Sequence, residues 1–290
     1  MSAEIIIIQA FNGLQFGVML FLMSAGLTLV FGIMNLINLA HGSLYMVGAY
    51  LAAAILQATG SFVLALALAV PLVALIGAII EVTVLRQLYH RDHLDQVLAT
   101  FALILFFNEL IRMIWGPQAH FMPIPDALSG SVTILPGVPY PLYRLAIVGA
   151  GIIIAAALYG LITRTRLGML IRAGSSNREM VGALGVNVQL LFTLLFGMGA
   201  GMAGFAGMMA APILSVEVGM GEPILILAFV VIVIGGIGSV RGAFIAALLV
   251  GLVDTFGRVL LPPALASMSI YILMAGILFW RPQGLFPAHG

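Results

Sequence analysis

The sequence predicts an all-α polytopic membrane protein with about eight or nine transmembrane helices. Apolar residues make up 63% of the chain and charged residues only 7%, and the mean hydropathy is +1.22. A soluble domain would carry about 25% charged residues to solvate its surface. The bilayer is therefore the solvent that this surface fits, and the 34 glycines suit helices that pack closely in lipid.

The apolar segments define the expected helices, because a span needs about 20 apolar residues. Residues 5–58 are almost continuously apolar and too long for one crossing, so we expect a turn between Gly32 and Asn38. If the second segment, within residues 36–57, re-enters the membrane, the count falls from nine to eight. The expected helices of this single transmembrane domain (1–290) are 8–31, 38–57, 61–84, 96–114, 142–162, 189–211, 223–238, 243–261 and 265–280.

Two segments between these helices are expected to lie outside the membrane. The first, residues 116–141, is rich in proline and is typical of a loop. The second, residues 164–188, is the most polar part of the chain. Within it, Ser176 or Asn177 could cap a short amphipathic helix, with Glu179 near the positive end of its dipole. The apolar face of this helix would consist of Met180, Val181 and Leu184.

The distribution of arginine predicts the orientation, because loops on the cytoplasmic side carry an excess of basic residues. With nine crossings, eight of the eleven arginines share one side, which we assign to the cytoplasm, and the N-terminus lies outside. A re-entrant second segment would move the N-terminus inside. The eight are Arg86, Arg91, Arg164, Arg166, Arg172, Arg178, Arg241 and Arg281, and the other three are Arg112, Arg144 and Arg258.

The absence of lysine and cysteine excludes several classes of activity. All eleven basic residues are arginines, whereas a Walker A loop and a protein-kinase site each need a lysine at the phosphates. The chain is thus not expected to hydrolyse ATP. Without cysteine there is no disulfide, thiolate metal site or cysteine nucleophile. No basic cluster suits nucleic acid, and no cofactor or metal is expected.

One polar stripe interrupts the apolar N-terminal third of the chain. On a helix, its residues would share one face, and such a face would not be stable against lipid. One hypothesis is a helix start at the interface, with amides that cap backbone groups. The other is a lining for the inner mouth of a translocation path. No second histidine or acid stands at metal-ligand spacing. The stripe consists of Asn35, Asn38, His41 and Tyr45, and Gly42 is a further candidate for the path.

Glycine patterns later in the chain predict close packing and a turn. Three pairs of small residues at a spacing of four predict a close helix–helix contact within 197–212: Gly197 and Gly201, Ala200 and Gly204, Ala203 and Gly207. The packing residues expected are Gly197, Gly201, Gly204 and Gly207. The stretch 234–243 contains Gly235, Gly236 and Gly238. It is interpreted either as a tight turn between spans or as a hinge or partner contact. A weak similarity between 39–51 and 240–252 raises the alternative of a parallel internal repeat.

Ionisable residues within spans are costly and are expected to be paired. Spacing on a helix predicts structural salt bridges between Glu109 and Arg112 and between Asp254 and Arg258. Glu81 lies near the end of its helix and is expected to snorkel to the interface or to meet Arg86.

Four motifs together resemble a known family over nearly the whole chain, in order. They are similar to the membrane permease of branched-chain amino acid ABC importers, the LivH type, and do not separate it well from urea and short-amide permeases. The motifs are GLTLVFGIMNLINLAHGSLYMVGAY (26–50), RTRLGMLIRAGSSNREMVGALGVNV (164–188), GGIGSVRGAFIAALLVGLV (235–253) and RPQGLF (281–286).

The resemblance implies an importer in the inner or plasma membrane of a bacterium or archaeon. A soluble binding protein would deliver substrate outside, a second homologous permease would complete the path, and two cytoplasmic ATPases would drive it. Residues 172–185 would carry the coupling helix to the ATPase, and Ser176-Asn177 replaces the acidic pair that families often have there. The coupling residues implied are Arg172, Arg178, Glu179, Gly182 and Gly185.

Two other functions compete with this interpretation. A secondary carrier or channel would work alone, but no two carboxylates share a mid-membrane helix face, as a proton-coupled carrier would often show. A membrane-embedded enzyme ranks last, because the sequence lacks a convincing catalytic cluster, and we expect no enzymatic activity.

Overall fold

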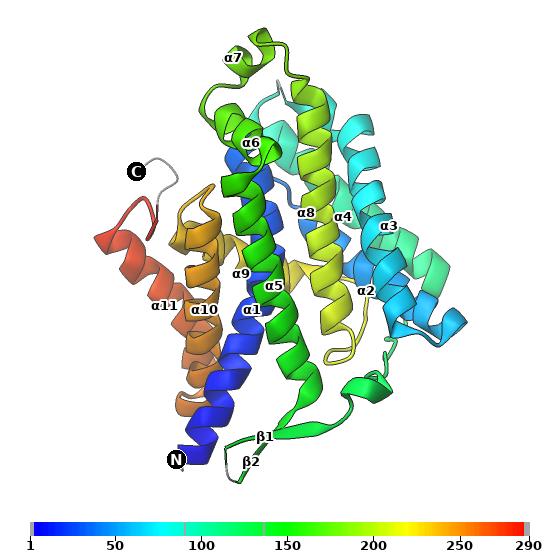
Figure 1. Ribbon diagram of the computed structural model, residues 1–290, viewed down its shortest axis with the longest axis vertical. Helices are drawn as coiled ribbons and strands as arrows, with labels where there is room; N and C mark the ends of the chain where they lie inside the picture. The colour runs from blue at the N-terminus through cyan, green and yellow to red at the C-terminus, as the bar shows by residue number, and fades with distance from the viewer. Residues whose placement is uncertain (1–2, 90, 136, 287–290) are drawn as a thin grey trace.

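The computed structural model describes residues 3–89, 91–135 and 137–286, and almost all of this part is helical (Figure 1). Eight of the described helices are long and apolar enough to cross a membrane, and α9 is a shorter apolar helix. The fold class is therefore confirmed. The helices are α1 (Ala3–Met34), α2 (His41–Thr59), α3 (Phe62–Thr83), η1 (Leu85–Leu88), α4 (His93–Trp115), η2 (Asp126–Leu128), α5 (Leu142–Arg164), α6 (Arg166–Ser176), α7 (Arg178–Ala183), α8 (Val188–Ala210), α9 (Gly221–Gly235), α10 (Val240–Leu260) and α11 (Pro263–Trp280).

The turn expected inside the first apolar run occurs at Asn35. This residue adopts a left-handed conformation with φ of 51°, which asparagine tolerates better than most residues. Its amide donates a 3.1 Å hydrogen bond to the Phe31 carbonyl and closes the last turn of α1. Residues 35–40 are not helical, so α2 begins at His41 rather than near residue 38.

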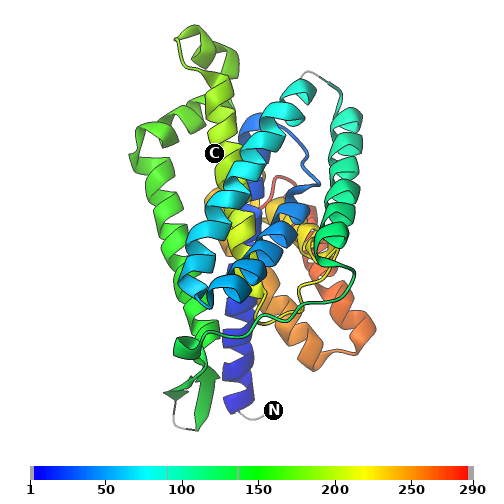
Figure 2. The same cartoon turned by 90° about the vertical axis from the view of Figure 1, so that its right-hand side faces the viewer.

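The two ends of the bundle differ in charge. The ends of α3, α5 and α11, the starts of α4, α8 and α10, and helices α6 and α7 all lie toward one end, and α1 starts at the other (Figures 1 and 2). The eight arginines that were expected to share one side belong to these segments. We call this the arginine-rich end, and the other the opposite end. The assignment of the arginine-rich end to the cytoplasm stays a prediction.

A short antiparallel hairpin lies in the proline-rich loop at the opposite end. Strand β1 (Ser131–Leu135) pairs with β2 (Val138–Pro141), with Val132 opposite Tyr140. The Tyr140 hydroxyl and the Arg144 guanidinium both donate to the Asn12 amide oxygen, at 3.1 and 2.6 Å. These hydrogen bonds fasten the hairpin and the start of α5 to α1.

The helix packing follows an approximate two-fold symmetry of inverted topology. Helix α1 packs against α10 as α8 packs against α3, and α9 contacts α1 as α2 contacts α8. Likewise α2 packs on α3 and α4 as α9 packs on α10 and α11. Helices α1 and α8, the two most buried spans, run in opposite directions (Figure 1). The packing therefore pairs α1–α4 with α8–α11.

Two glycine contacts mark the positions where corresponding helices of the two halves meet. Helices α1 and α8 cross where a Cβ on Gly26 would stand 2.7 Å from the Gly199 carbonyl oxygen. The N-termini of α2 and α9 meet where a Cβ on Gly42 would stand 2.6 Å from the Gly221 carbonyl oxygen. The parallel repeat suggested by 39–51 and 240–252 is therefore wrong, because α2 corresponds to α9 and not to α10.

The glycine-rich stretch 234–243 contains a turn between two helices, as one of the two interpretations expected. Gly236 and Gly238 adopt φ values of 98° and 81°, and the turn joins α9 to α10 at the arginine-rich end. The C-terminal segment pairs with the last residues of α9, because the amides of Leu285 and Phe286 donate to carbonyls of Ile234 and Gly235 at 2.8 and 3.0 Å.

The small residues of α8 lie against two neighbouring helices. A Cβ on Gly204 would stand 2.8 Å from the Val73 Cβ of α3, and on its α2 side Gly204 lies against Gly48. Gly207 lies against the backbone carbonyl of Tyr45. A larger side chain has no room at Gly204 and Gly207, whereas at Gly197 and Gly201 a Cβ would stand 3.2 and 3.3 Å from atoms of Ala74 on α3.

We expect Gly204→Leu to destabilise the protein by about 1–3 kcal/mol, because the new side chain overpacks the α2–α3–α8 contact. The measurement is thermal unfolding of the purified chain in detergent. Gly149→Leu on α5 is the matched control, since a Cβ there meets nothing within 4 Å. Equal melting temperatures for the two variants would contradict the packing role.

Candidate functional site

The segment that follows α1 carries polar side chains into the bundle. Asn35 is exposed, whereas Asn38 and His41 are completely buried. The residue that caps α2 is Ala40, and no side chain bonds to the free amides there. The expectation of one helical polar face is therefore wrong: Asn35 has left-handed backbone, Asn38 lies in a non-helical segment, and only His41 and Tyr45 share a helix face.

Three of these side chains form what we call the entry cluster: Asn38, His41 and Tyr45. The His41 Nε2 lies 3.2 Å from the Met23 carbonyl oxygen of α1. Within the described residues, both polar atoms of the Asn38 amide, the His41 Nδ1 and the Tyr45 hydroxyl have no hydrogen-bond partner. A buried polar group without a partner costs about 1–3 kcal/mol, so these atoms form an energetically costly polar set inside the bundle.

The entry cluster adjoins the contact between the two halves of the fold. Gly42, next to His41, touches Gly221 at the start of α9, so two helix N-termini with their positive dipole ends meet beside the cluster. The arrangement has no charged side chain of its own. Among the described residues no group of His, Cys, Asp and Glu side chains could hold a metal ion.

The predicted coupling segment forms two short helices that protrude at the arginine-rich end (Figure 1). Asn177 caps α7, because its side-chain oxygen accepts a 2.9 Å hydrogen bond from the Met180 amide. Gly182 lies inside α7, and Gly185 follows it with φ of 85°. Arg178 begins α7, but its side chain lies outside the described part of the structure.

The expected apolar face of α7 is divided between the bundle and the exterior. Val181 is 5% exposed, whereas Met180 and Leu184 are 58% and 77% exposed. Glu179 is also exposed. The exposed part of α7 thus presents two large apolar side chains beside a carboxylate.

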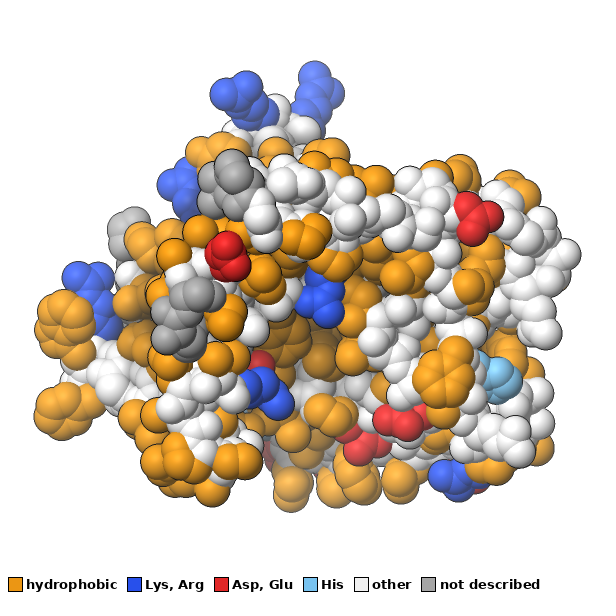
Figure 3. All heavy atoms as spheres, turned by 90° about the horizontal axis from the view of Figure 1, so that it is seen from below, with side chains coloured by type: hydrophobic (Ala, Val, Ile, Leu, Met, Phe, Trp, Pro, Cys, Tyr) orange, Lys and Arg blue, Asp and Glu red, His pale blue; other side chains and the backbone are white. Residues whose placement is uncertain are grey.

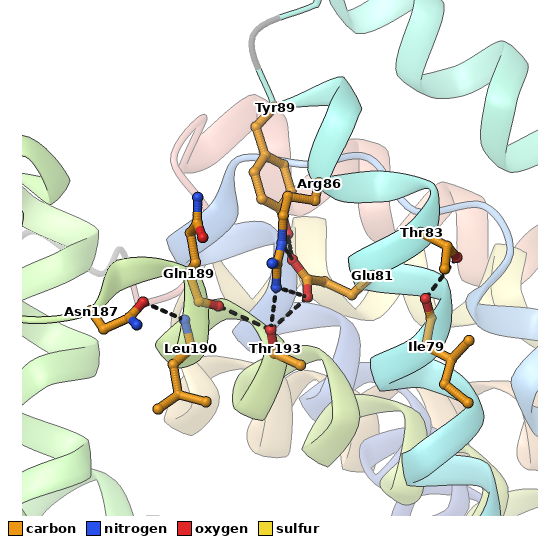
Figure 4. A network of polar contacts seen from close by, with 9 residues as sticks. All are labelled: Ile79, Glu81, Thr83, Arg86, Tyr89, Asn187, Gln189, Leu190 and Thr193. Atoms are coloured by element: carbon orange, nitrogen blue, oxygen red, sulfur yellow. Dashed lines mark hydrogen bonds and ion pairs between the residues drawn. The ribbon is translucent and has the colours of Figure 1, made fainter.

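A buried carboxylate joins α3 to the start of α8, close to the coupling segment (Figure 4). Glu81 is completely buried and accepts hydrogen bonds from Arg86, Tyr89 and Thr193, at 3.0, 2.5 and 2.6 Å. Arg86 also donates to the Thr193 hydroxyl at 2.8 Å. Asn187, six residues before Thr193, caps α8 by accepting from the Leu190 amide. We call Glu81, Arg86, Tyr89 and Thr193 the Glu81 network.

Sequence reasoning found part of this network. The Glu81–Arg86 pair was one of two expectations, and it is the one that the structure contains. Tyr89 and Thr193 were missed; the only signal for Thr193 was one hydroxyl within an apolar helix, 112 residues from its partner. The pKa of Tyr89 is raised, mainly by burial and next by the hydrogen bond to Glu81. The phenol therefore keeps the proton that it donates.

The two charged pairs expected on α4 and α10 are as predicted. Asn108 of α4, also missed, donates to Glu222 at the start of α9 at 2.9 Å. The predicted pairs are Glu109–Arg112 at 2.6 Å and Asp254–Arg258 at 2.8 Å.

Figure 3 shows the opposite end, where hydrophobic side chains surround a central hollow with charged side chains along it.

A cavity of about 800 Å³ lies near the arginine-rich end, between α1, α5, α6 and the α9–α10 turn. Asn35 and Arg172 line it, whereas the entry cluster does not. The structure thus separates the predicted path residues, because Asn35 faces this cavity and the others are enclosed between α1, α2, α8 and α9.

Comparison with known proteins gives consistent matches over nearly the whole chain. Residues 9–278 match the family described as branched-chain amino acid transport system / permease component. The chain is 28% identical to the high-affinity branched-chain amino acid transport system permease protein BraD of Pseudomonas aeruginosa, covering 96% of this chain and 94% of the relative. It is 27% identical to LivH of Escherichia coli (strain K12), over the same shares.

A more distant match comes from an archaeon. The chain is 26% identical to the probable branched-chain amino acid transport permease protein LivH of Methanocaldococcus jannaschii, over 92% of this chain and 88% of the relative. No solved structure gives a significant match.

We expect Glu81→Ala to lower the free energy of unfolding by about 1–3 kcal/mol, because Arg86, Tyr89 and Thr193 lose their shared acceptor. Thermal unfolding in detergent measures the loss. Glu109→Ala, which breaks an exposed pair, is expected to change stability by less than about 1 kcal/mol. A Glu81 variant as stable as the Glu109 variant would show that the network does not hold α3 to α8.

Proposed function

We propose a role for this chain from one established premise: it belongs to the family of branched-chain amino acid transport system permease components. In this proposal the chain and a second homologous permease form the path by which branched-chain, or other hydrophobic, amino acids enter the cell. An extracytoplasmic binding protein delivers the substrate, and two cytoplasmic ATPases drive transport through the inner or plasma membrane. The observation that carries the proposal is the family match, which covers nearly every described helix.

The composition supports a motor on separate polypeptides. Without a lysine, the chain has no Walker A site. It therefore needs a contact surface for a soluble ATPase at its cytoplasmic end. The excess of arginine supports the arginine-rich end as that side.

Helix α7 is the best candidate for this contact surface. It protrudes at the arginine-rich end (Figure 1), and its exposed Met180 and Leu184 are suited to insertion into a groove of a partner. Glu179 of α7 and Arg172 of α6 are exposed and supply charge at this end of the bundle, and Arg178 belongs to the proposed contact by its place at the start of α7. Gly182 and Gly185 keep the helix short and allow a close approach.

The path candidates are the residues of the entry cluster and their neighbours. In many transporters the substrate site lies at the interface of inverted repeats, where interrupted helices begin. Here α2 and α9 begin beside each other at Gly42 and Gly221, and the cluster provides donors and acceptors without partners. An uncharged set of this kind suits the polar groups of an amino acid passing along an otherwise apolar path.

Uptake by the reconstituted complex tests this role. We expect ATP-dependent uptake of leucine into proteoliposomes only when the second permease, the ATPases and the binding protein are present with this chain. Asn38→Leu and His41→Leu are expected to reduce uptake about tenfold, equivalent to ~1.4 kcal/mol, without loss of thermal stability, because each removes a buried polar group that lacks a full set of partners.

The matched control is Ser43→Ala, on the same helix but outside the entry cluster. Ion-gradient-driven uptake by this chain alone would reject the ATP-driven role in favour of a carrier. Uptake of urea or a short amide but not of leucine would reject the substrate class. Normal uptake by both cluster variants would remove these residues from the path while leaving the ATP-driven role intact.

We expect Leu184→Ser to weaken association with the ATPases about tenfold, because it removes the most exposed apolar side chain of α7 from the interface. Co-purification at graded salt and subunit concentration measures the effect. Met113→Ser is the control, since Met113 is 84% exposed and lies near the end of α4, away from the arginine-rich end (Figure 2). Equal recovery of the ATPases with both variants would refute a coupling role for α7.

A further inference from the structure

The cavity between α1, α5, α6 and the α9–α10 turn, which we call the flank cavity, lies outside the entry cluster, and Arg172 is the one residue of the proposed ATPase contact in its described lining. Its walls carry guanidinium groups from two helices, Arg172 of α6 and Arg241 of α10. Leu29, Ile162 and Ile237 are among the apolar side chains that also line it. The cavity therefore combines two positive charges with an apolar lining.

The charge in the flank cavity is not neutralised by its own lining. No acidic residue lines the cavity, and within the described residues neither arginine forms a salt bridge. The Arg241 Nη2 donates to the Tyr159 hydroxyl at 2.8 Å, and its Cζ lies 4.8 Å from the centroid of that ring. Tyr159 thus orients Arg241 without cancelling its charge, which leaves a prepared site for an anion.

Two further groups on the walls favour a ligand with polar oxygens. Thr28 of α1 lines the cavity and is 1% exposed, and its hydroxyl has no hydrogen-bond partner within the described residues. Ser239, also in the lining, caps α10 by accepting from the Gly242 amide at 3.1 Å. The positive end of the α10 dipole therefore lies at the same cavity.

The apolar surface below the arginines indicates that the ligand has hydrocarbon chains. On α10, Ile245 and Leu249 follow Arg241 by one and two turns on the same face, and both are exposed. On α5, Ile152 precedes Tyr159 by two turns on its face and is 53% exposed. Helices α5 and α10 border the cavity on either side of α1 (Figure 1), so each bordering helix continues from the charged rim as a lipid-facing surface.

We propose that the flank cavity binds an anionic phospholipid of the leaflet at the arginine-rich end. The phosphate lies between Arg172 and Arg241, and the acyl chains run along the apolar faces of α5 and α10. Basic pockets between transmembrane helices at the cytoplasmic side are suited to anionic headgroups. A lipid in this position would fill the space beside α1. It would also connect α10 to α6, the first helix of the predicted coupling segment.

Titration of the purified full-length chain with phosphatidylglycerol, followed by native mass spectrometry in detergent, tests the proposal. We expect Arg241→Gln to weaken phosphatidylglycerol binding about fivefold, as expected for one arginine at an anionic headgroup. Arg172→Gln gives a second, independent variant and is expected to act in the same direction. Phosphatidylcholine is expected to bind the wild-type protein no better than it binds either variant.

Arg91→Gln is the matched control, because it removes the same charge from the exposed loop before α4 and outside the cavity lining. It is expected to bind phosphatidylglycerol as the wild type does.

Three results would overturn the proposal. The first is wild-type affinity in both cavity variants. The second is binding of inorganic phosphate to the wild-type protein as tight as that of phosphatidylglycerol, which would indicate a free-anion site. The third is loss of ATPase co-purification in Arg241→Gln with unchanged lipid binding, which would indicate a protein contact.

Discussion

The fold depends on the close approach of helix backbones at glycine. In lipid, apolar side chains gain little by leaving one apolar surface for another, so helices associate through close packing. The contacts of Gly26 with Gly199 and of Gly48 with Gly204 bring α1 and α2 against α8. Because α1 and α8 are the two most buried spans, they form a centre that encloses irregular backbone. Residues 35–40 can therefore leave helical geometry inside the bundle, where lipid would not tolerate it.

This enclosure explains why the polar groups of the entry cluster lie inside an apolar protein. Because α2 begins in the interior, the non-helical segment before it and its first residue place Asn38 and His41 where few partners exist. The corresponding interruption precedes α9, so both halves of the fold place a helix start at the same contact. Buried polar atoms without partners are costly, and retaining them is most easily understood if another conformation, water or a transported solute satisfies them.

Much of this could be predicted from sequence, because the decisive signals were local. Hydropathy alone located the spans to within a few residues, and helical spacing identified the Glu109–Arg112 pair. Asn177 was one of two expected caps. The polar stripe failed because the left-handed turn at Asn35 removes the helix on which the stripe depended. Neither the inverted symmetry nor the Glu81–Thr193 hydrogen bond could be predicted from the sequence. Each relates segments that are far apart in the chain and show no sequence similarity to one another.

Helix α8 connects the coupling segment to the entry cluster, and its contacts make it a rigid connection. It begins after a four-residue link from α7, residues 184–187, and the Glu81 network holds its second turn to α3. Farther along, Gly204 and Gly207 touch Gly48 and the Tyr45 backbone of α2. No flexible side chain separates these backbones, so α8 cannot shift along α2 without breaking the contact or moving α2 with it. A force applied at α7 would therefore be expected to reach the cluster through α8. Helix α5 packs mainly on α1 and α6, and its Tyr143 hydroxyl donates a 2.9 Å hydrogen bond to the Met209 carbonyl near the end of α8.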